Sequence, residues 1–535
     1  MKESSVQSSS GPGEKFLATV VLCAGLLRIA ILFRLADGNL VQHIPDDAFY
    51  YLAPARNFAA LGRWTFDGVE PSSGLHMLWG YLIALLFRIA PNATLHQVFA
   101  VAGVFQAFCL ALASYLVAVT GRRILKQNVV PGVAIVFLSA VCIEQAGWLM
   151  ESVITILASS TVLWLLARER IHITPVTAAG SVLLGFFLMM SRSDSGLLAF
   201  LFLVTLVILW KFGKVEASMP FVAALVLGGA VFGLLTTVLH THWVSGHWVQ
   251  SSAQQKVFWT HVMPRSLPLV DTFFVIASFF NPLFNEKLFL EKAMGSHLAA
   301  KLVINLLRLV ILVPIGWGLC SAIRLRRNTA AQGILFGLLA VLLCYSAFYS
   351  LDAAVQDWYV ANLAAPAAIL SGAAFAYLMQ RSRILVYSFV ALLCIPGFIF
   401  SLTPTFLWQE AMYRSGVYLH THPEVDHAAS LNAGIIGFFT HGNLTNLDGL
   451  INDSILPYAK SGTLAQYLVK RHIDYILESP QMFYAWMPLR GGYADGKIHR
   501  CITSTVDLFP DDPYNDYAGD RIRLYHLDMN CLAAK

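Results

Sequence analysis

Two adjacent carboxylates, Asp46 and Asp47, are the residues whose type and spacing most directly suggest chemistry. The aromatic residues Phe49, Tyr50 and Tyr51 follow them at once. Two neighbouring acids repel each other, and near an apolar surface one of them can have a raised pKa, as a general base requires. The same oxygen atoms can instead hold a divalent cation. The pair therefore predicts either proton transfer or metal binding.

The residues after the two carboxylates have the period of a helix that is followed by turns. Asp46, Tyr50 and Asn57 would share one face of this helix, and Asp47 and Tyr51 another. Beyond it we expect turns at three glycines, with aromatic side chains at the membrane interface between them. These residues are Gly62, Gly68, Gly74, Trp64, Phe66 and Trp79. A loop with its own helix and turns is more often functional than idle.

The composition of the chain places these residues in a membrane protein. Of 535 residues, 57% are hydrophobic and 13% are charged. A soluble domain is about 45–50% apolar and about 25% charged. The composition therefore excludes soluble, disordered, collagenous and disulfide-scaffold classes. The net charge of +5 is small for this length and gives no reason to expect a nucleic-acid partner.

Eleven apolar runs have the length needed to cross a bilayer. They cover residues 16–36, 97–120, 129–147, 152–168, 175–191, 196–212, 219–239, 300–323, 331–350, 358–380 and 384–403. The shorter run 76–90 fits a helix that lies in the membrane interface. We therefore expect an α-helical polytopic protein with about eleven transmembrane helices plus interfacial helices.

Basic residues predict the orientation, because cytoplasmic loops carry an excess of lysine and arginine. If residues 76–90 do not cross the membrane, fourteen basic residues fall on one face. They are Lys2, Lys15, Arg122, Arg123, Lys126, Arg168, Arg170, Lys211, Lys214, Arg324, Arg326, Arg327, Arg381 and Arg383. This face is expected to be cytoplasmic, with residues 1–15 as its tail. Residues 16–403 then form the transmembrane domain, and 37–96, 240–299 and 404–535 lie outside the cell (inner) membrane.

The last outer segment has ordinary polarity and is long enough for a small domain. Within it, 433–439 and 473–477 predict strands and 463–471 predicts a helix, which favours an α/β or α+β domain. Cys501 and Cys531 fall in this domain, in a compartment that permits disulfides. Two cysteines do not by themselves establish a bridge, so both states stay open.

Charged residues from loops that are distant in sequence gather on the expected outer face. Besides the two adjacent aspartates they are Glu151, Arg192, Asp194, Lys256, Asp352 and Asp357. A charge at membrane depth costs roughly 2.5–3.5 kcal/mol, so a set on one face favours a polar cavity there.

Plainer interpretations compete for several of these charges. Asp352 and Asp357 fit solvated helix ends best. Arg192 and Asp194 fit a local salt bridge that caps a helix about as well as they fit a ligand site. Glu151 has no basic neighbour in sequence and fits a helix end that snorkels to the interface.

One series of residues follows from the two carboxylates through the first outer segment. It runs Asp46-Asp47-Ala48-Phe49-Tyr50-Tyr51, Ala55-Arg56-Asn57, Gly62, Thr65-Phe66-Asp67-Gly68, Pro71, Gly74, His76 and Leu78-Trp79. This series resembles the first outer loop of the bacterial GT-C glycosyltransferases. It is similar above all to uncharacterised membrane proteins near the arabinofuranosyltransferase and aminoarabinose- or mannosyltransferase branches.

Shorter stretches resemble the same family in the expected order along the chain. They are Met150-Glu151, Arg192-Ser193-Asp194, Ser252 through Lys256, Trp358-Tyr359, Ala433 through Gly437 and Asn446 through Asn452. The chain departs from the pattern at Asn432, where an aspartate is usual, and near Lys256, where a proline is missing.

The resemblance implies an inverting hexosyl- or pentosyltransferase that takes a sugar from a polyprenyl-phosphate-linked donor. The acceptor would be an envelope glycan, lipid or protein on the outer face, a groove in the membrane would hold the isoprenoid tail, and membrane lipid would be a further partner. Asp46 would be the base, with Asp47 assisting it or binding a possible divalent metal ion. Arg192 or Lys256 would stabilise the departing phosphate.

The substrate-binding residues that the resemblance implies come from all of these stretches. They are Tyr50, Arg56, His76, Glu151, Arg192, Asp194, Lys256, Trp358 and Tyr359, whereas packing suits Trp79 better. Two other functions stay open. A transporter or lipid permease without bond-breaking chemistry is favoured by Arg28, a charge inside the first span. An inactive scaffold descended from such enzymes is the other.

Overall fold

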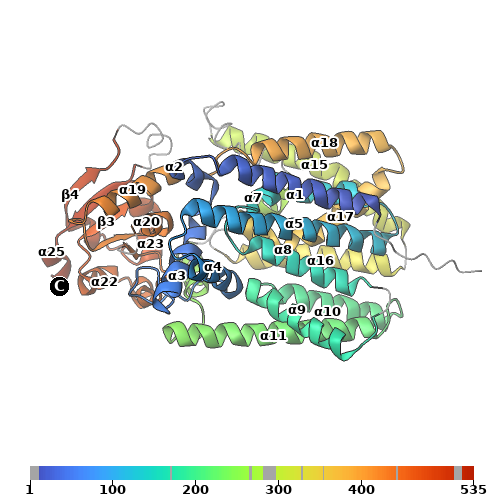
Figure 1. Ribbon diagram of the computed structural model, residues 1–535, viewed down its shortest axis with the longest axis horizontal. Coiled ribbons are helices and arrows are strands. Elements are labelled where there is room, and N and C mark those ends of the chain that lie inside the picture. Colours follow the sequence, from blue (N-terminus) through green and yellow to red (C-terminus); the bar gives the residue numbers. More distant parts are fainter. Residues whose placement is uncertain are drawn as a thin grey trace, which may run out of the picture.

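The computed structural model describes residues 11–168, 171–263, 268–280, 297–326, 329–352, 355–440, 444–510 and 521–534. These residues form a long helical body, with a smaller part containing a five-stranded sheet at one of its ends (Figure 1). Residues 1–10 of the expected tail, Arg170 and Arg327 of the expected cytoplasmic face, and residues 264–267 and 281–296 of the second outer segment lie outside the described residues.

The helical body consists of apolar helices, as the hydropathy predicts. Among the described residues, six segments are long and apolar enough to cross a membrane. They are α1 (Pro12–Leu32), α5 (Leu95–Leu125), α11 (Ser218–Ser245), α16 (Ala330–Ser350), Asp357–Leu378 and α18 (Arg383–Phe400). Shorter apolar helices accompany them: α4 (Met77–Ile89), α8 (Ser152–Leu166), α9 (Pro175–Ser191), α10 (Gly196–Lys211) and part of α15 (His297–Leu325). The protein is an integral membrane protein.

The expected span over 129–147 is wrong, because the chain breaks there into α6 (Val130–Phe137) and α7 (Ala140–Gln145). The break lies at Ser139, whose backbone is extended and whose hydroxyl accepts a hydrogen bond from the amide of Cys142. Serine competes with the helix in this way and starts a new one. Neither piece is long enough to cross a bilayer.

Arg28, the charge inside α1, is bound to backbone carbonyl groups where helices end. Its Nε donates to the carbonyl of Ser401 at 2.9 Å, just after α18, and its Nη1 donates to that of Ala146 at 3.1 Å, just after α7. Carbonyl groups at helix ends lack partners within the helix and need such donors. Arg28 therefore caps the C-terminal ends of α18 and α7, which is a structural role.

The first outer segment forms α2 (Asp37–Leu40), η1 (Val41–His43) and α3 (Asp46–Leu61), followed by turns. Gly62 ends α3 and Gly68 lies in the next turn, both with positive φ, as expected. Trp64 and Phe66 are both 3% exposed, so these rings pack inside the protein. Trp64 stacks on Phe58 with 4.4 Å between ring centroids, so the turn after α3 folds back on that helix.

The indole of Trp79 on α4 is also buried, as its expected packing role requires. Its Nε1 donates to the carbonyl of Leu149 at 2.7 Å. This bond joins α4 to the turn before α8 and satisfies the polar atom of a buried indole.

The C-terminal domain begins with α19 (Gln409–Thr421) and has the sheet order β2-β1-β3-β5-β4. The strands are β1 (Ala428–Ser430), β2 (Leu444–Asn446), β3 (Tyr475–Glu478), β4 (Ile502–Asp507) and β5 (Arg523–Leu527). β1 is parallel to β2 and β3, whereas β5 is antiparallel to β3 and β4. The main helices around the sheet are α20 (Gly434–Phe439), α21 (Leu456–Ser461), α22 (Leu464–Arg471), α23 (Met487–Gly491), α24 (Lys497–Arg500) and α25 (Met529–Ala533).

This domain confirms the expected α/β class, the helix over 463–471 and the strand near 473–477. The strand expected over 433–439 is wrong, because these residues form α20. The amides of Gly434 and Ile435 donate to the carboxylate of Asp46, so a contact with a distant part of the chain stabilises the start of the helix.

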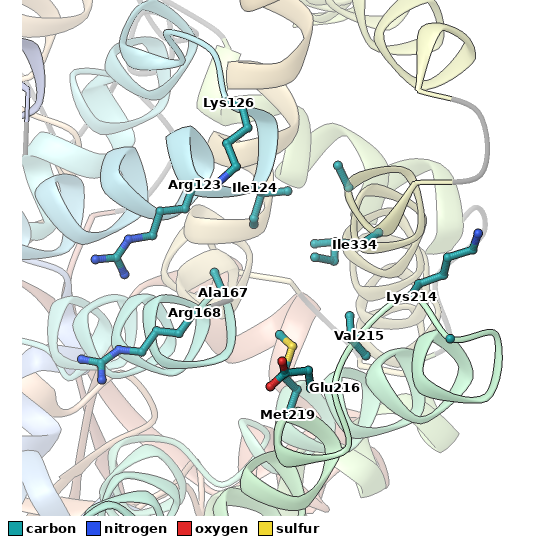
Figure 2. A pocket seen from close by; sticks show the side chains of 13 residues that line it. Arg123, Ile124, Lys126, Ala167, Arg168, Lys214, Val215, Glu216, Met219 and Ile334 are labelled. Atoms are coloured by element: carbon teal, nitrogen blue, oxygen red, sulfur yellow. The ribbon is translucent and has the colours of Figure 1, made fainter. Parts of the chain in front are cut away.

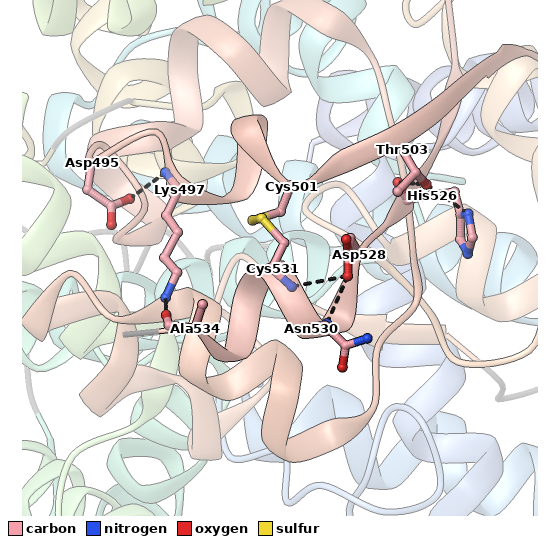
Figure 3. The surroundings of a disulfide bond; sticks show 9 residues. All are labelled: Asp495, Lys497, Cys501, Thr503, His526, Asp528, Asn530, Cys531 and Ala534. Atoms are coloured by element: carbon pink, nitrogen blue, oxygen red, sulfur yellow. Dashed lines mark hydrogen bonds between the residues drawn. A yellow bond between two sulfur atoms is a disulfide. The ribbon is translucent and has the colours of Figure 1, made fainter.

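Cys501 and Cys531 form a disulfide, with 5.5 Å between their Cα atoms (Figure 3). The bridge attaches α25 to the start of β4. Asp528 caps α25, since its Oδ1 accepts hydrogen bonds from the amides of Asn530 and Cys531. The disulfide and this cap together hold the last described helix on the sheet.

Candidate active site

A pocket lies where the helical body meets the C-terminal domain. Its walls come from α3, the loop before α4, the loop before α8, the end of α9, α12 (Ser251–Val262), η3 (Asp357–Leu363) and the loop after β2. The lining residues are Asp47, Tyr50, Tyr51, Gly74, Leu75, His76, Met150, Glu151, Arg192, Ser252, Lys256, Trp358, Tyr359, Leu450 and Ile451. The fold thus brings seven distant stretches of the chain to one place.

Most of the residues that the sequence singles out line this pocket. They are Asp47, Tyr50, His76, Glu151, Arg192, Lys256, Trp358 and Tyr359. Asp46, Arg56 and Asp194 do not line it and lie behind its walls.

The two adjacent aspartates point to different places, as neighbours on a helix must. Asp46 is 8% exposed, and its Oδ1 accepts a hydrogen bond of 2.6 Å from the amide of Ile435. Burial raises the pKa of Asp46 to about 8, although the bonds from α20 oppose the shift. Asp47 lines the pocket, and burial raises its pKa too, against the opposing charge of Lys256. Of the two, Asp47 is the carboxylate that can meet a substrate.

Arg192 lies between two carboxylates. Its Nη1 donates to Glu151 Oε1 at 2.6 Å, and its Nε and Nη2 donate to the two oxygens of Asp194 at 3.2 and 3.0 Å. Glu151 is 1% exposed, so the interpretation as a snorkelling helix end is wrong. The local salt bridge expected for Arg192 and Asp194 is present, and Arg192 also reaches the pocket.

Both carboxylate oxygens of Asp194 accept hydrogen bonds behind the pocket wall. Its Oδ2 accepts a hydrogen bond from the hydroxyl of Tyr349 at 2.7 Å, and its Oδ1 accepts one from the amide of Asn362 at 3.0 Å. Asp194 therefore holds Arg192 in place without facing the pocket.

Among the described residues, no carboxylate forms a direct ion pair with Lys256, the second cation of the pocket. Its Nζ donates to the hydroxyl of Tyr359 and lies 4.5 Å from the centre of that ring. Burial lowers the pKa of Lys256, but Tyr359, Asp352 and Asp47 together raise it above its ordinary value. The ammonium group therefore stays charged at neutral pH.

His76 adds a neutral polar group to the pocket. Its Nε2 lies 3.7 Å from Glu151 Oε1. Burial lowers the pKa of His76 to about 4, and the charge of Glu151 only partly opposes this. The imidazole is therefore neutral at pH 7.

Asp448 is a residue next to the pocket that we did not predict as part of the site. Its Oδ2 accepts a hydrogen bond of 2.6 Å from the hydroxyl of Tyr50, and its Oδ1 accepts one from the amide of Leu450. Burial raises the pKa of Asp448 to about 7. The family-like stretch 446–452 was the available signal, but it did not show which of its residues reaches α3.

Gly74 allows the C-terminal domain to approach the pocket. A Cβ atom at this position would lie 1.7 Å from the carbonyl oxygen of Leu450 and 2.7 Å from the hydroxyl oxygen of Ser251. The Ser251 hydroxyl donates to the same carbonyl at 2.8 Å. Only glycine permits this close approach.

Arg56 supports α20 and does not touch the pocket. Its Nη2 donates to the carbonyl of Phe438 at 3.1 Å, and its guanidinium group lies 4.6 Å from the centre of the Phe438 ring. Arg56 and Asp46 thus both bind α20, one near each end.

A metal ion finds no suitable set of ligands in the part of the chain that the structure describes. These residues contain no group of three or more histidine, cysteine, aspartate or glutamate side chains that could hold one. Of the acidic groups in the pocket, Glu151 is paired with Arg192, and Asp47 lies close to the charge of Lys256. The possible metal role of Asp47 therefore stays a prediction, since one or two carboxylates together with substrate phosphates can also bind a divalent ion.

No protein-family model and no curated protein matches the sequence. Solved structures do match. ArnT from Cupriavidus metallidurans in the apo state has a TM-score of 0.56 at 12% identity, over 97% of this chain and 98% of that one. The same protein bound to undecaprenyl phosphate has a TM-score of 0.52 at 14% identity, over the same shares.

The third structure is the Archaeoglobus fulgidus oligosaccharyltransferase AglB in complex with an inhibitory peptide and a dolichol-phosphate. It has a TM-score of 0.51 at 14% identity, over 88% of this chain and 70% of that one. The chain has the GT-C fold. This confirms the fold class implied by the resemblance of the first outer segment. In this GT-C fold the candidate site lies between the helical body and the C-terminal domain.

Proposed function

We propose that this protein is an inverting glycosyltransferase that moves a sugar from a polyprenyl-phosphate-linked donor to an acceptor hydroxyl group on the outer face of the cell membrane. The observation that carries the proposal is the pocket in which the carboxylate of Asp47 and the ammonium group of Lys256 come together. The undecaprenyl phosphate bound to ArnT and the dolichol-phosphate bound to AglB support a donor of this class. The acceptor would be an envelope glycan, lipid or protein.

Asp47 is the general base in this proposal. Its carboxylate takes the proton of the acceptor hydroxyl as the acceptor oxygen bonds to the anomeric carbon of the donor. The bond from that carbon to the phosphate oxygen breaks on the opposite side, so the configuration inverts and polyprenyl phosphate leaves with the bonding electrons. A pKa raised by burial makes Asp47 a stronger base than an ordinary aspartate. Asp46 takes a supporting role, because α20 occupies its oxygen atoms.

Lys256 stabilises the departing phosphate in this proposal. Negative charge grows on the phosphate oxygens as the bond breaks, and a fixed cation in a partly dry pocket stabilises it most. Arg192 suits this task less, since Glu151 and Asp194 already balance its charge. The neutral imidazole of His76 can donate a hydrogen bond to the same phosphate.

The experiment that tests this function is a transfer assay on the purified full chain with a panel of polyprenyl-phosphate sugars. Asp47→Asn should lose roughly 10²- to 10⁴-fold in rate, the usual contribution of a general base. Asp46→Asn should lose less. The matched control is Asp426→Asn in the C-terminal domain, whose side chain is 60% exposed, and it should keep the wild-type rate.

Undiminished transfer by Asp47→Asn would overturn the assignment of the base. Movement of the lipid across the bilayer without consumption of the donor would favour the transporter instead. Arg28, the charge that favoured a transporter, binds backbone carbonyl groups and has a structural role. Mass spectrometry of envelope glycans with and without the gene would identify the acceptor.

The orientation belongs to the same proposal. A single cysteine at Lys126 should react with an impermeant thiol reagent only after the membrane is opened, and one at Asp426 should react in intact cells. Both positions are exposed, so burial does not limit either reaction. Labelling of position 126 from outside would reverse the topology.

A further inference from the structure

The turn between β1 and α20 joins the C-terminal domain to the helical body through two buried carboxylates. Glu478, at the end of β3, is 2% exposed, and Asp46, at the start of α3, is 8% exposed. Four backbone amides within residues 431–435 donate hydrogen bonds to these two side chains. One short turn is therefore held from both sides, by one carboxylate of each part of the protein.

Glu478 binds the part of the turn that lies next to β1. Its Oε2 accepts hydrogen bonds from the amides of Leu431 and Asn432 at 3.1 and 2.9 Å and from the hydroxyl of Ser430 at 3.2 Å. Its Oε1 accepts one from the amide of Ser479 at 2.9 Å. These donors hold the turn in one geometry, because a buried donor that moved away from the carboxylate would be left without a partner.

Asp46 binds the next part of the same turn, where α20 begins. Its Oδ1 accepts a hydrogen bond of 2.6 Å from the amide of Ile435, and its Oδ2 accepts one of 3.3 Å from the amide of Gly434. A Cβ atom at Gly434 would lie 2.4 Å from the carbonyl oxygen of Asp46, so the two backbones are in close contact. Only Ala433 separates the amides that bind Glu478 from those that bind Asp46. A shift of the turn at one carboxylate therefore reaches the other.

The general base proposed above is the next residue along α3. Asp47 follows Asp46 directly and lines the candidate active site. Consecutive Cα atoms are about 3.8 Å apart and joined by a planar peptide group, so a displacement of Asp46 also displaces Asp47. The position of the turn therefore affects where the carboxylate of Asp47 lies in the pocket.

This meeting of polar groups distinguishes the turn from the pocket between the ends of α5, α8 and α10. In that pocket the charged ends of Arg168 and Lys214 point away from the opening (Figure 2). At the turn, in contrast, both carboxylates face the amides that they bind.

We propose that Glu478 is a positioning residue for the transfer reaction, because it fixes the turn that holds Asp46 and so keeps the carboxylate of Asp47 in its place in the pocket. The proposal rests on the proposed function, in which Asp47 is the general base. Glu478 does not line the pocket, so it acts through the turn and not on the substrate.

Hydrogen–deuterium exchange of the full chain in detergent tests the coupling without any transfer assay. Glu478→Ala removes the four hydrogen bonds of the carboxylate, and the amides of residues 434 and 435 should then exchange about tenfold faster. Glu478→Gln can keep the bonds made by Oε2, but its NH₂ group then faces the amide of Ser479, so exchange should be about threefold faster. The control Asp528→Ala removes the cap of α25 in the same domain and should leave these two amides unchanged.

The transfer assay separates a positioning role from a merely structural one. Glu478→Ala should lower kcat roughly 10- to 100-fold, because a small misplacement of a catalytic group costs this much, with little change in KM for the donor. In a double-mutant cycle with Asp46→Asn the two losses should be less than additive, because either change releases the same turn. Asp528→Ala should keep the wild-type rate.

Unchanged exchange of residues 434 and 435 in the Glu478 variants would overturn the proposal. So would a wild-type kcat in these variants, additive losses in the cycle, or an equal loss of kcat in Asp528→Ala. If Glu478→Ala does not fold, Glu478→Gln decides by the same two measurements. Failure of the proposed function would look different, because the wild type would then transfer no sugar while the exchange of residues 434 and 435 still responded to Glu478.

Discussion

The hydroxyl group of Tyr50 donates a hydrogen bond of 2.6 Å to Asp448, a residue 398 positions later in the chain. Asp448 also accepts a hydrogen bond from the amide of Leu450, which lines the pocket together with Ile451. The C-terminal domain therefore forms one wall of the candidate site, and its docking on α3 decides the shape of that site.

Loss of this bond should lower transfer without unfolding the protein. Tyr50→Phe leaves the buried Asp448 with one donor fewer, and a hydrogen bond to a charged group contributes about 1.5–3 kcal/mol. We expect kcat/KM to fall at least about tenfold. In a double-mutant cycle with Asp448→Asn the two losses should be less than additive. Tyr387→Phe is the control, because that ring is 52% exposed on α18, and it should leave the rate unchanged.

Arg192 should be more important for stability than Glu151. Arg192→Gln leaves two buried carboxylates without their cation, and breaking a buried pair costs about 3–5 kcal/mol. Glu151→Gln leaves Arg192 paired with Asp194 and should cost less free energy of unfolding. The partly exposed pair of Arg523 and Asp507 is the control, and Arg523→Gln should cost at most about 1 kcal/mol. Denaturant unfolding in detergent measures all three, and equal costs for Arg192→Gln and Glu151→Gln would contradict the network.

Substitution of Gly74 should disturb the site without changing its chemical groups. Alanine would place a Cβ atom 1.7 Å from the carbonyl oxygen of Leu450, so the loop and the C-terminal domain must move apart. A shift of about 1 Å in a positioned site can cost about 10²-fold in rate. Gly180→Ala on α9 is the matched control, since no atom lies within 4 Å of its added carbon. Equal rates for the two variants would show that the close approach at Gly74 is unimportant.

Asp46 should make the protein less stable as the pH rises from about 4 to about 8. Its pKa is about 8 in the folded chain and 3.8 ordinarily, so between these values the folded state binds the proton more tightly than the unfolded chain. The free energy of unfolding then decreases with rising pH. The amide of Asp46→Asn does not titrate. The difference in free energy of unfolding between the wild type and this variant should therefore decrease as the pH rises across this range. A difference in melting temperature that stays constant or grows with pH would contradict the raised pKa.

The sequence by itself determined the membrane class and most of the helices, because hydropathy over twenty residues is a local property. The sequence also indicated the candidate site residues, because charged side chains at membrane depth cost free energy and need a functional or structural reason. These residues are Asp46, Asp47, Glu151, Arg192 and Lys256. The helix over 463–471 and the neighbouring strand could also be predicted from local sequence, because their apolar residues repeat with the period of each element.

Only the tertiary structure decided which of these charges meet and which of them face the pocket. The sequence does not distinguish the roles of Asp46 and Asp47. In the structure, Asp46 is hydrogen-bonded to α20, whereas Asp47 lines the pocket. The same contact makes 434–439 a helix where the apolar run favoured a strand. Tyr50 and Asp448 lie 398 residues apart in the sequence, so no local sequence pattern predicts the hydrogen bond between them. Local periodicity therefore predicts the elements, whereas the directions of polar side chains depend on packing between distant elements.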